Sequence, residues 1–174
     1  INQHAFAYSR LKKVNLPDGL SFIDAWSFWN SDIESIIVPN SVKSIAFVAF
    51  GACQNLKTVQ LPATLEKLDY ESFSGCTNLR TVYSLATTPP AATYDTFEKC
   101  PEDRILYVPK ASLKDYKNAD YWKDFAQILP IETAGINDVI DTDLVYSSKE
   151  KGKVSITGLH IGEIIQCYNA SGLL

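Results

Sequence analysis

Four cysteines and two histidines are the side chains of this sequence that are best suited to nucleophilic or metal chemistry. Cys53, Cys76 and Cys100 follow one another at intervals of 23 and 24 residues, whereas Cys167 stands apart near the C-terminus. Zinc sites commonly use Cys-x-x-Cys pairs, which the sequence lacks. The spacing instead predicts a column of buried thiols that act as small hydrophobic side chains. A disulfide within the column is the alternative, and it requires a specific geometry.

The two histidines have no neighbours that suggest catalysis. His4 lies near the start of the chain, and His160 lies in the turn-like segment 158–162. Neither accompanies a Cys or Ser motif that would form an activated nucleophile. The sequence also has no Gly-rich phosphate-binding loop. We therefore expect both histidines to be ordinary surface residues, and we expect neither an enzyme nor a cofactor.

A small acidic cluster and a glycosylation sequon are the remaining chemical signals. Asp138, Asp141 and Asp143 resemble part of a calcium site, but the Gly and the distal Glu of a calcium loop are missing. The sequon at residues 169–171 falls in a predicted tight turn, so it is explained by turn chemistry. We expect a solvated linker at the acidic cluster and no metal.

Composition narrows the class of protein. The 174 residues are 46% hydrophobic and 21% charged, with a net charge of −4. An acidic chain has no electrostatic footprint for nucleic acid. The sequence has no apolar run of about 20 residues, so we expect no membrane insertion. It contains no Met, even at position 1, and opens within a repeat. We therefore expect a segment of a longer protein, folded as one or two domains.

Apolar residues recur every 22 to 24 positions and form columns that specify a repeat. A period of 20 to 29 residues with an L-x-x-V-x-L core is typical of leucine-rich repeats. One repeat cannot bury its apolar face alone, but stacked repeats form a continuous core. The most regular column contains Phe6, Phe28, Phe50, Phe73 and Phe97, and another contains Val14, Ile36, Val59, Val82 and Leu106.

Each repeat divides into a strand and a return segment. Thr58–Leu61 alternates between inward and outward residues, which predicts a short strand that Pro62 ends. Residues 70–73 predict one helical or 3₁₀ turn. The segment 75–78 predicts a turn in which Gly75 and Asn78 suit positive φ. The strands should stack in parallel, one per repeat.

The pattern I-x-x-x-A/S-F-x-x-C-x-x-L-x-x-V-x-L-P resembles the BspA-type leucine-rich repeat of surface proteins in Bacteroides-like bacteria. Its best copies run from Ile45 to Pro62 and from Leu68 to Val82, and the resemblance covers about residues 1–109. It implies an α/β fold, a leucine-rich-repeat solenoid with one short parallel strand per 22–24-residue repeat. It also implies contacts with host matrix proteins, other bacteria or glycans.

Residues 110–129 predict a helical cap over the open end of the core. Ser112 is the expected N-cap of this helix. The alternative is an aromatic sugar-binding platform formed by Tyr121 and Trp122. The residues expected on one apolar helical face are Tyr116, Trp122, Phe125 and Ile128.

The C-terminal region changes to plain strand alternation. We expect a solenoid with cap over residues 1–133, a linker at 134–140 and a partial β-sandwich-like module at 141–174. The expected strands are 144–146, 153–157 and 163–168. Residues 140–174 resemble C-terminal modules of secreted bacterial proteins, some of which are sorting signals for type IX secretion.

The outward side chains of the strands are the candidate binding residues. A solvated face needs only polar groups, yet apolar and tyrosine side chains occur here, and tyrosine is enriched at contact surfaces. Ordinary β-propensity is the alternative explanation. The candidate ligand-binding residues are Ile37, Gln60, Tyr83, Ile105 and Tyr107.

The sequence as a whole predicts a non-catalytic recognition or adhesion module, secreted or on the bacterial cell surface. It would bind a protein or glycan ligand on a host or neighbouring cell. The contact surface would be the outward side chains of the strands, which we call the strand face. A structural spacer and an accessory domain of a larger secreted protein or enzyme are the alternatives. The step from fold to ligand is an analogy with the family that the repeat resembles.

Overall fold

The structure is a computed structural model that describes residues 1–131 in full and, beyond them, the backbone of residues 146–150 and 153–157. The chain divides into two compact units, Ile1–Ile131 and Glu132–Leu174, and each is considered by itself. The predicted linker at 134–140 lies outside the described residues.

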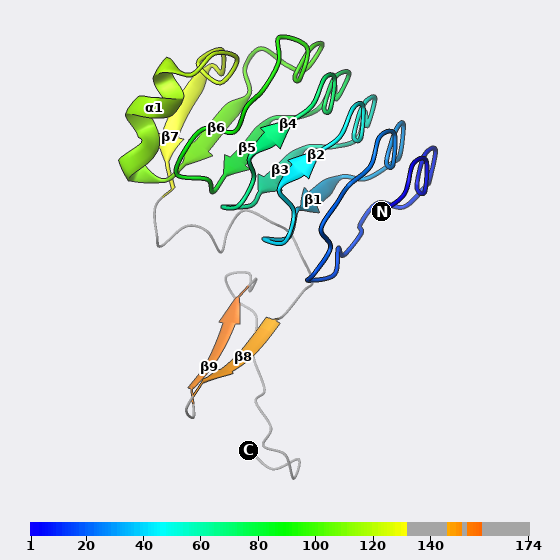
Figure 1. Ribbon diagram of the computed structural model, residues 1–174, viewed down its shortest axis with the longest axis horizontal. Helices are drawn as coiled ribbons and strands as arrows, with labels where there is room; N and C mark the ends of the chain where they lie inside the picture. The colour runs from blue at the N-terminus through cyan, green and yellow to red at the C-terminus, as the bar shows by residue number, and fades with distance from the viewer. Residues whose placement is uncertain (132–145, 151–152, 158–174) are drawn as a thin grey trace. The chain divides into compact units, whose positions relative to one another are not determined.

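The first unit is a solenoid whose strands stack in parallel, as the repeat predicts (Figure 1). In the larger sheet, Val59 pairs with Ile36 on one side and with Val82 on the other. A one-repeat step along the sequence is therefore one step across the sheet. The strands of this sheet, in order, are β1 Ser35–Ile37, β3 Thr58–Leu61, β5 Thr81–Ser84, β6 Ile105–Val108 and β7 Gln127–Pro130. A second sheet pairs β2 Ser44–Ile45 with β4 Lys67–Leu68.

The phenylalanine column forms the centre of the core. Adjacent rings lie parallel, with centroids 5.0 Å apart for Phe28 and Phe50 and 5.2 Å apart for Phe50 and Phe73. All three side chains are fully buried. The prediction of a continuous column is confirmed, because each ring packs on one from the repeat before and one from the repeat after.

The expected helical or 3₁₀ turn at residues 70–73 was wrong. Glu71 has φ +54°, and Val48 and Trp26 have the same left-handed backbone one and two repeats earlier. With this geometry, N–H groups bond alternately within the turn and to the next repeat: the Gly51 N–H donates to the Val48 carbonyl over 3.0 Å, and the Phe50 N–H donates to the Ser72 carbonyl over 2.9 Å. Figure 1 shows these segments as a row of tight loops at one end of the repeats.

Glycine and asparagine have different roles in the following turn. Gly75 has φ +75°, as predicted. Asn78 does not have the expected positive φ. Its side-chain Nδ2 donates to the Gln54 carbonyl over 2.8 Å, so Asn78 joins two repeats.

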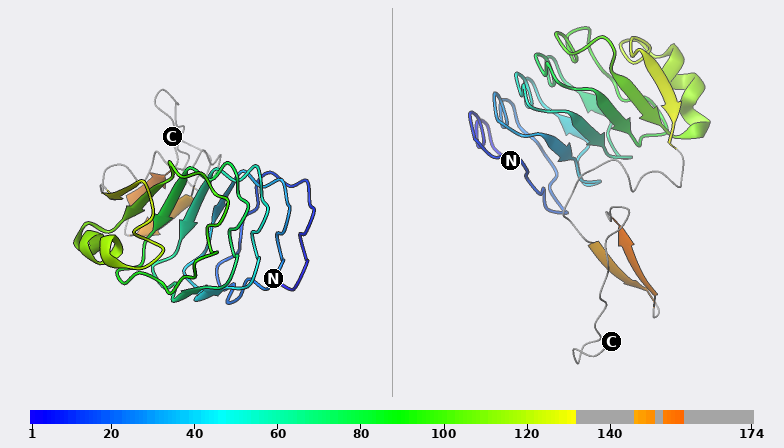
Figure 2. Two further views of the ribbon diagram at one scale, coloured as in Figure 1. Left: turned by 90° about the horizontal axis from the view of Figure 1, so that it is seen from above. Right: turned by 180° about the vertical axis from the view of Figure 1, so that it is seen from behind.

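A short cap covers the C-terminal end of the solenoid (Figure 2). It consists of the 3₁₀ helix Lys110–Ser112 and the helix α1, Leu113–Asn118. Ser112 occupies the N-cap position, but its hydroxyl donates to the Thr87 carbonyl and not to α1. The Trp122 ring packs edge-on against Phe97, with centroids 5.7 Å apart, and closes the phenylalanine column.

The cap is not helical throughout. Ile128, expected on the apolar helical face, lies in strand β7 and pairs with Leu106. The chain leaves the helix at Ala119, which has extended backbone. The backbone N–H and C=O groups along the outer edge of β6 need hydrogen-bond partners, and a further strand supplies them where a helical turn would not.

In the second unit, β8 Tyr146–Glu150 and β9 Lys153–Thr157 pair antiparallel. The predicted strand at 153–157 is confirmed. Residues 144–145 of the first expected strand, all of the third strand at 163–168, and the sequon lie outside the described residues.

The packing of the phenylalanine column leads to a testable prediction about stability. Replacing Phe50 by Ala should lower the free energy of unfolding by about 3–5 kcal/mol, because the cavity opens between two packed rings. Urea unfolding followed by circular dichroism measures this loss. Tyr70→Ala is the matched control, since Tyr70 is exposed and its loss should change stability by no more than about 0.5 kcal/mol. Equal losses in the two variants would contradict a core role for Phe50.

Candidate functional site

The structure brings four of the five candidate binding residues into one row across the sheet. Ile37 pairs with Gln60, Gln60 with Tyr83, and Tyr83 with Tyr107. Ile105 lies in the neighbouring outward row, where it pairs with Thr81. These side chains point outward because successive side chains of a strand alternate between its two faces, and the side chains at the alternate positions are buried in the core.

Two tyrosines lie in ring-to-ring contact on this strand face. The Tyr83 and Tyr107 rings are stacked, with centroids 4.8 Å apart and planes 9° apart. Tyr83 is only 8% exposed, whereas Tyr107 is half-buried. Burial, with a smaller contribution from Tyr107, raises the pKa of Tyr83 to about 12. Tyr83 therefore supports Tyr107, and Tyr107 offers the larger accessible surface.

Sequence reasoning missed one member of the row. Leu129 pairs with Tyr107 and extends the apolar surface by one strand. It was missed because the helical cap was expected to extend to residue 129. A signal was present: Ile128 follows Leu106 by 22 residues, which is the repeat period.

The cysteine column is structural, as the spacing predicts. The Cys53 thiol donates to the Phe28 carbonyl over 3.0 Å, and the Cys76 thiol donates to the Phe50 carbonyl over 3.1 Å. Burial raises the pKa of Cys53. All three thiols, Cys100 included, are free and buried, so the alternative of a disulfide is not realised in this structure.

The other chemical candidates do not assemble into a reactive centre. His4 is exposed and stacks on Trp26, with ring centroids 5.3 Å apart. Trp122 is 1% exposed and cannot form the sugar-binding platform considered with Tyr121. Within residues 1–131, no group of three or more His, Cys, Asp or Glu side chains could hold a metal ion. His160 and the acidic cluster at 138–143 lie outside the described residues.

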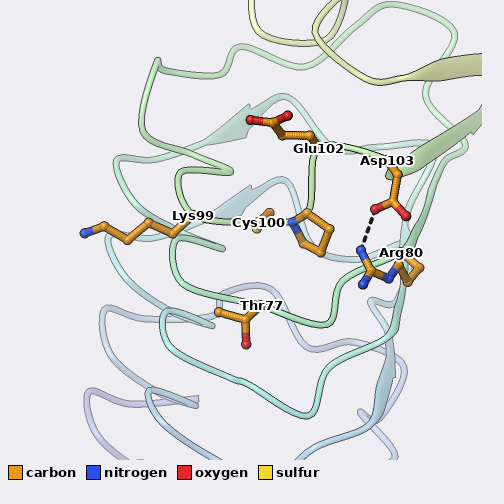
Figure 3. Close-up of a pocket in the computed structure, with 7 residues that line it drawn as sticks. Thr77, Arg80, Lys99, Cys100, Glu102 and Asp103 are labelled. Atoms are coloured by element: carbon orange, nitrogen blue, oxygen red, sulfur yellow. Dashed lines mark hydrogen bonds and ion pairs between the residues drawn. The ribbon is translucent and has the colours of Figure 1, made fainter.

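A shallow polar hollow lies between the fourth and fifth repeats (Figure 3). Arg80 and Asp103 point toward each other across it and form an ion pair. Lys99 points away from this pair, and its ammonium lies 3.8 Å from the Glu98 carboxylate. Among the described residues, Arg80 pairs with Asp103 and Lys99 with Glu98, whereas Glu102 lines the hollow without an ion pair. No acid, base and nucleophile are brought together at the hollow.

Comparison with known families decides what kind of repeat this is. The BspA type leucine-rich repeat region matches residues 1–103 in six copies, which is more than half of the chain. The chain belongs to this family. No curated protein matches it. The BspA-type assignment agrees with the parallel solenoid, and repeat families of this kind are generally non-catalytic. Among the described helices, none has the length and apolarity to cross a membrane.

The BspA-type repeats carry a second surface that sequence reasoning did not single out. Phe47, Tyr70 and Tyr94 lie three positions before the core residues Phe50, Phe73 and Phe97 in successive repeats. Tyr70 is 52% exposed and Tyr94 is 75% exposed, while Phe47 is half-buried and contacts the Trp26 ring edge-on at 5.0 Å. We call these four residues, Trp26, Phe47, Tyr70 and Tyr94, the aromatic row. The signal for Phe47, Tyr70 and Tyr94 was their shared distance to the phenylalanine column, whereas Trp26 lies two positions before Phe28.

The raised pKa of Tyr83 makes stability depend on pH. An unfolded tyrosine ionises near pH 10. Between pH 10 and 12 the folded chain therefore holds a proton on Tyr83 that the unfolded chain has lost, and stability falls as pH rises. Phenylalanine cannot ionise, so over this pH window the free energy of unfolding of Tyr83→Phe should fall by about 2 kcal/mol less than that of the parent.

Urea unfolding at pH 7 and at pH 11.5 measures the difference. At pH 7 the two proteins should agree within about 0.5 kcal/mol, because the structure gives the Tyr83 hydroxyl no hydrogen bond to another described residue. The decline that remains in Tyr83→Phe should come in part from Tyr116, whose pKa burial also raises to about 12. Parallel declines in the parent and the variant would contradict the burial of the Tyr83 phenol.

Proposed function

We propose that this chain is a non-catalytic recognition module that binds a protein or glycan ligand outside the cell through its strand face. The observation that carries the proposal is the row Ile37, Gln60, Tyr83, Tyr107 and Leu129 across five adjacent strands. Four of these five side chains are apolar or aromatic at positions where a face that met only water would need polar groups. The BspA-type family is consistent with a surface or adhesion-type repeat module.

The order of the strand face favours binding. Side chains that are already held in place lose little conformational entropy when a ligand docks. The Tyr83 and Tyr107 rings are held by their mutual stacking, and the underlying strands are held by the parallel sheet. Tyrosine also presents a broad apolar ring with a hydrogen-bonding hydroxyl, which suits ligands of mixed polarity.

The size of the strand face sets the expected strength of binding. Five strands about 4.8 Å apart span roughly 20 Å, and each offers about 10 Å of length. A standard protein interface buries about 800 Å² on each partner. The strand face alone is smaller than this, so we expect weak binding, or binding to a short peptide or glycan. Additional repeats or flanking surfaces would be needed for high affinity.

Replacing Tyr107 by Ala tests the proposal. The whole chain is applied to a panel of extracellular-matrix proteins and to a glycan array, and dissociation constants are measured for every ligand that binds. Tyr107→Ala should weaken binding at least about 10-fold, since central tyrosines commonly contribute more than about 1.4 kcal/mol. Phe22→Ala is the matched control and should bind normally, because Phe22 is 45% exposed and lies outside both the strand face and the aromatic row. Failure of the parent to bind any member of the panel, or equal binding by Tyr107→Ala, would refute the strand face as the site.

A further inference from the structure

The aromatic row is a second exposed surface, and it does not belong to the strand face. Its residues come from the left-handed turn segments, which Figure 1 shows as loops at one end of the repeats. Tyr70 and Tyr94 occupy the same position in consecutive repeats, and their side chains are 52% and 75% exposed. Large aromatic side chains that are exposed at the same position in successive repeats favour an interaction site.

Packing does not account for the two tyrosines. Within residues 1–131, neither the Tyr70 ring nor the Tyr94 ring contacts another aromatic ring, and neither hydroxyl is hydrogen-bonded to the protein. The equivalent position one repeat earlier, Phe47, is half-buried and packs against Trp26. The row therefore begins as a packed cluster at Trp26 and Phe47 and opens into free ring faces at Tyr70 and Tyr94.

Charge distinguishes this surface from the rest of the solenoid. The turn segments 24–30, 46–52, 69–75 and 93–99 contain five carboxylates and one lysine. The remainder of residues 1–131 contains twelve Lys and Arg against nine Asp and Glu. The aromatic row thus lies on an acidic edge of a solenoid whose other surfaces are slightly basic. A ligand that binds here should carry positive charge.

Two carboxylates lie next to the exposed rings. Asp95 follows Tyr94 directly and is 5% exposed; its Oδ1 accepts hydrogen bonds from the Thr93 hydroxyl, over 2.6 Å, and from the Glu71 backbone N–H, over 3.4 Å. It is a negative charge held in place beside the row. Glu71, a half-buried residue, follows Tyr70, and its carboxylate makes no hydrogen bond or ion pair with another described residue.

We propose that the aromatic row, together with Glu71 and Asp95, binds a basic segment of a partner protein, with Lys or Arg side chains seated over the Tyr70 and Tyr94 rings. A cation is attracted to the face of an aromatic ring, and nearby carboxylates add to that attraction. Neighbouring repeats are about 4.8 Å apart, so the three repeats of Phe47, Tyr70 and Tyr94 span about 10 Å. Three residues of an extended segment cover the same length. This inference does not rest on the strand face, and either surface could bind without the other.

A labelled peptide tests the proposal with the whole chain. The probe is a fluorescein-labelled nonapeptide of alternating Arg and Gly, and the comparison peptides carry Glu or Ser in place of Arg. Fluorescence anisotropy at low and at moderate salt should show binding of the basic peptide alone. Tyr70→Leu and Tyr94→Leu keep the apolar bulk but remove the ring, and each should weaken binding about two- to fivefold. Glu71→Gln should weaken binding to a similar degree and reduce its dependence on salt.

The controls separate ring-specific binding from general attraction to an acidic protein. Tyr70→Phe keeps the ring face and should bind as the parent does. Tyr121→Leu removes a tyrosine in the cap, 37% exposed and outside the aromatic row, and should also bind normally. The altered side chains are exposed, and unchanged unfolding midpoints would verify that the variants are folded.

Three outcomes would overturn the proposal. The first is equal binding by the parent and both leucine variants, which would mean that charge alone attracts the peptide. The second is equal binding of the basic and Ser-containing peptides. The third is Tyr70-dependent binding to a glycan array with no peptide binding, which would assign the aromatic row to a carbohydrate. Tyr107→Ala should leave peptide binding unchanged, so failure here is distinct from failure of the strand-face proposal.

Discussion

The stacking of one repeat on the next is the interaction on which the whole solenoid depends. A single repeat of 22 to 24 residues has an apolar interior that only its neighbours can cover. The Phe28, Phe50 and Phe73 rings satisfy this requirement face to face. The backbone satisfies it again at both ends of each repeat, through the parallel strands and through hydrogen bonds such as Phe50 N–H to the Ser72 carbonyl. Side chains and backbone therefore impose the same register.

That register also organises the surface. Because each repeat contributes the same positions, equivalent residues line up across the solenoid as rows. Most inward positions are occupied by apolar groups, although Ser27 and Ser72 are also fully buried. One column holds thiols that donate to carbonyls of the preceding repeat. The outward positions of the strands and the turn segments are left to vary. The strand face and the aromatic row both hold aromatic side chains at these variable positions, and they lie on different parts of the repeat.

The C-terminal end shows how the stack is closed. Trp122 and Phe125 pack edge-on against Phe97, the last ring of the column. The Arg104 guanidinium lies 4.7 Å above the Phe125 ring, so a charged side chain covers part of the core where the repeat pattern has lapsed. After helix α1, strand β7 adds a final strand to the sheet. The closure thus combines one more strand with aromatic packing, and it places Leu129 at the end of the strand face.

Much of this solenoid was determined by the sequence alone, because the period of the repeat can be read directly from the residue types that recur along the chain. The phenylalanine column, the buried thiols, the parallel strands and the outward row of Ile37, Gln60, Tyr83 and Tyr107 follow from counting positions. Three features depended on tertiary structure. Glu71 is left-handed because its neighbours bond to adjacent repeats, and local propensity cannot reveal such long-range partners. Residues 127–130 form a strand because the edge of β6 offers hydrogen bonds, although their apolar spacing also suits a helix. The unequal burial of two chemically identical tyrosines was likewise decided by packing: Tyr83 lies beneath its neighbours on the strand face, whereas Tyr70 projects from the turn edge, where no other repeat covers it.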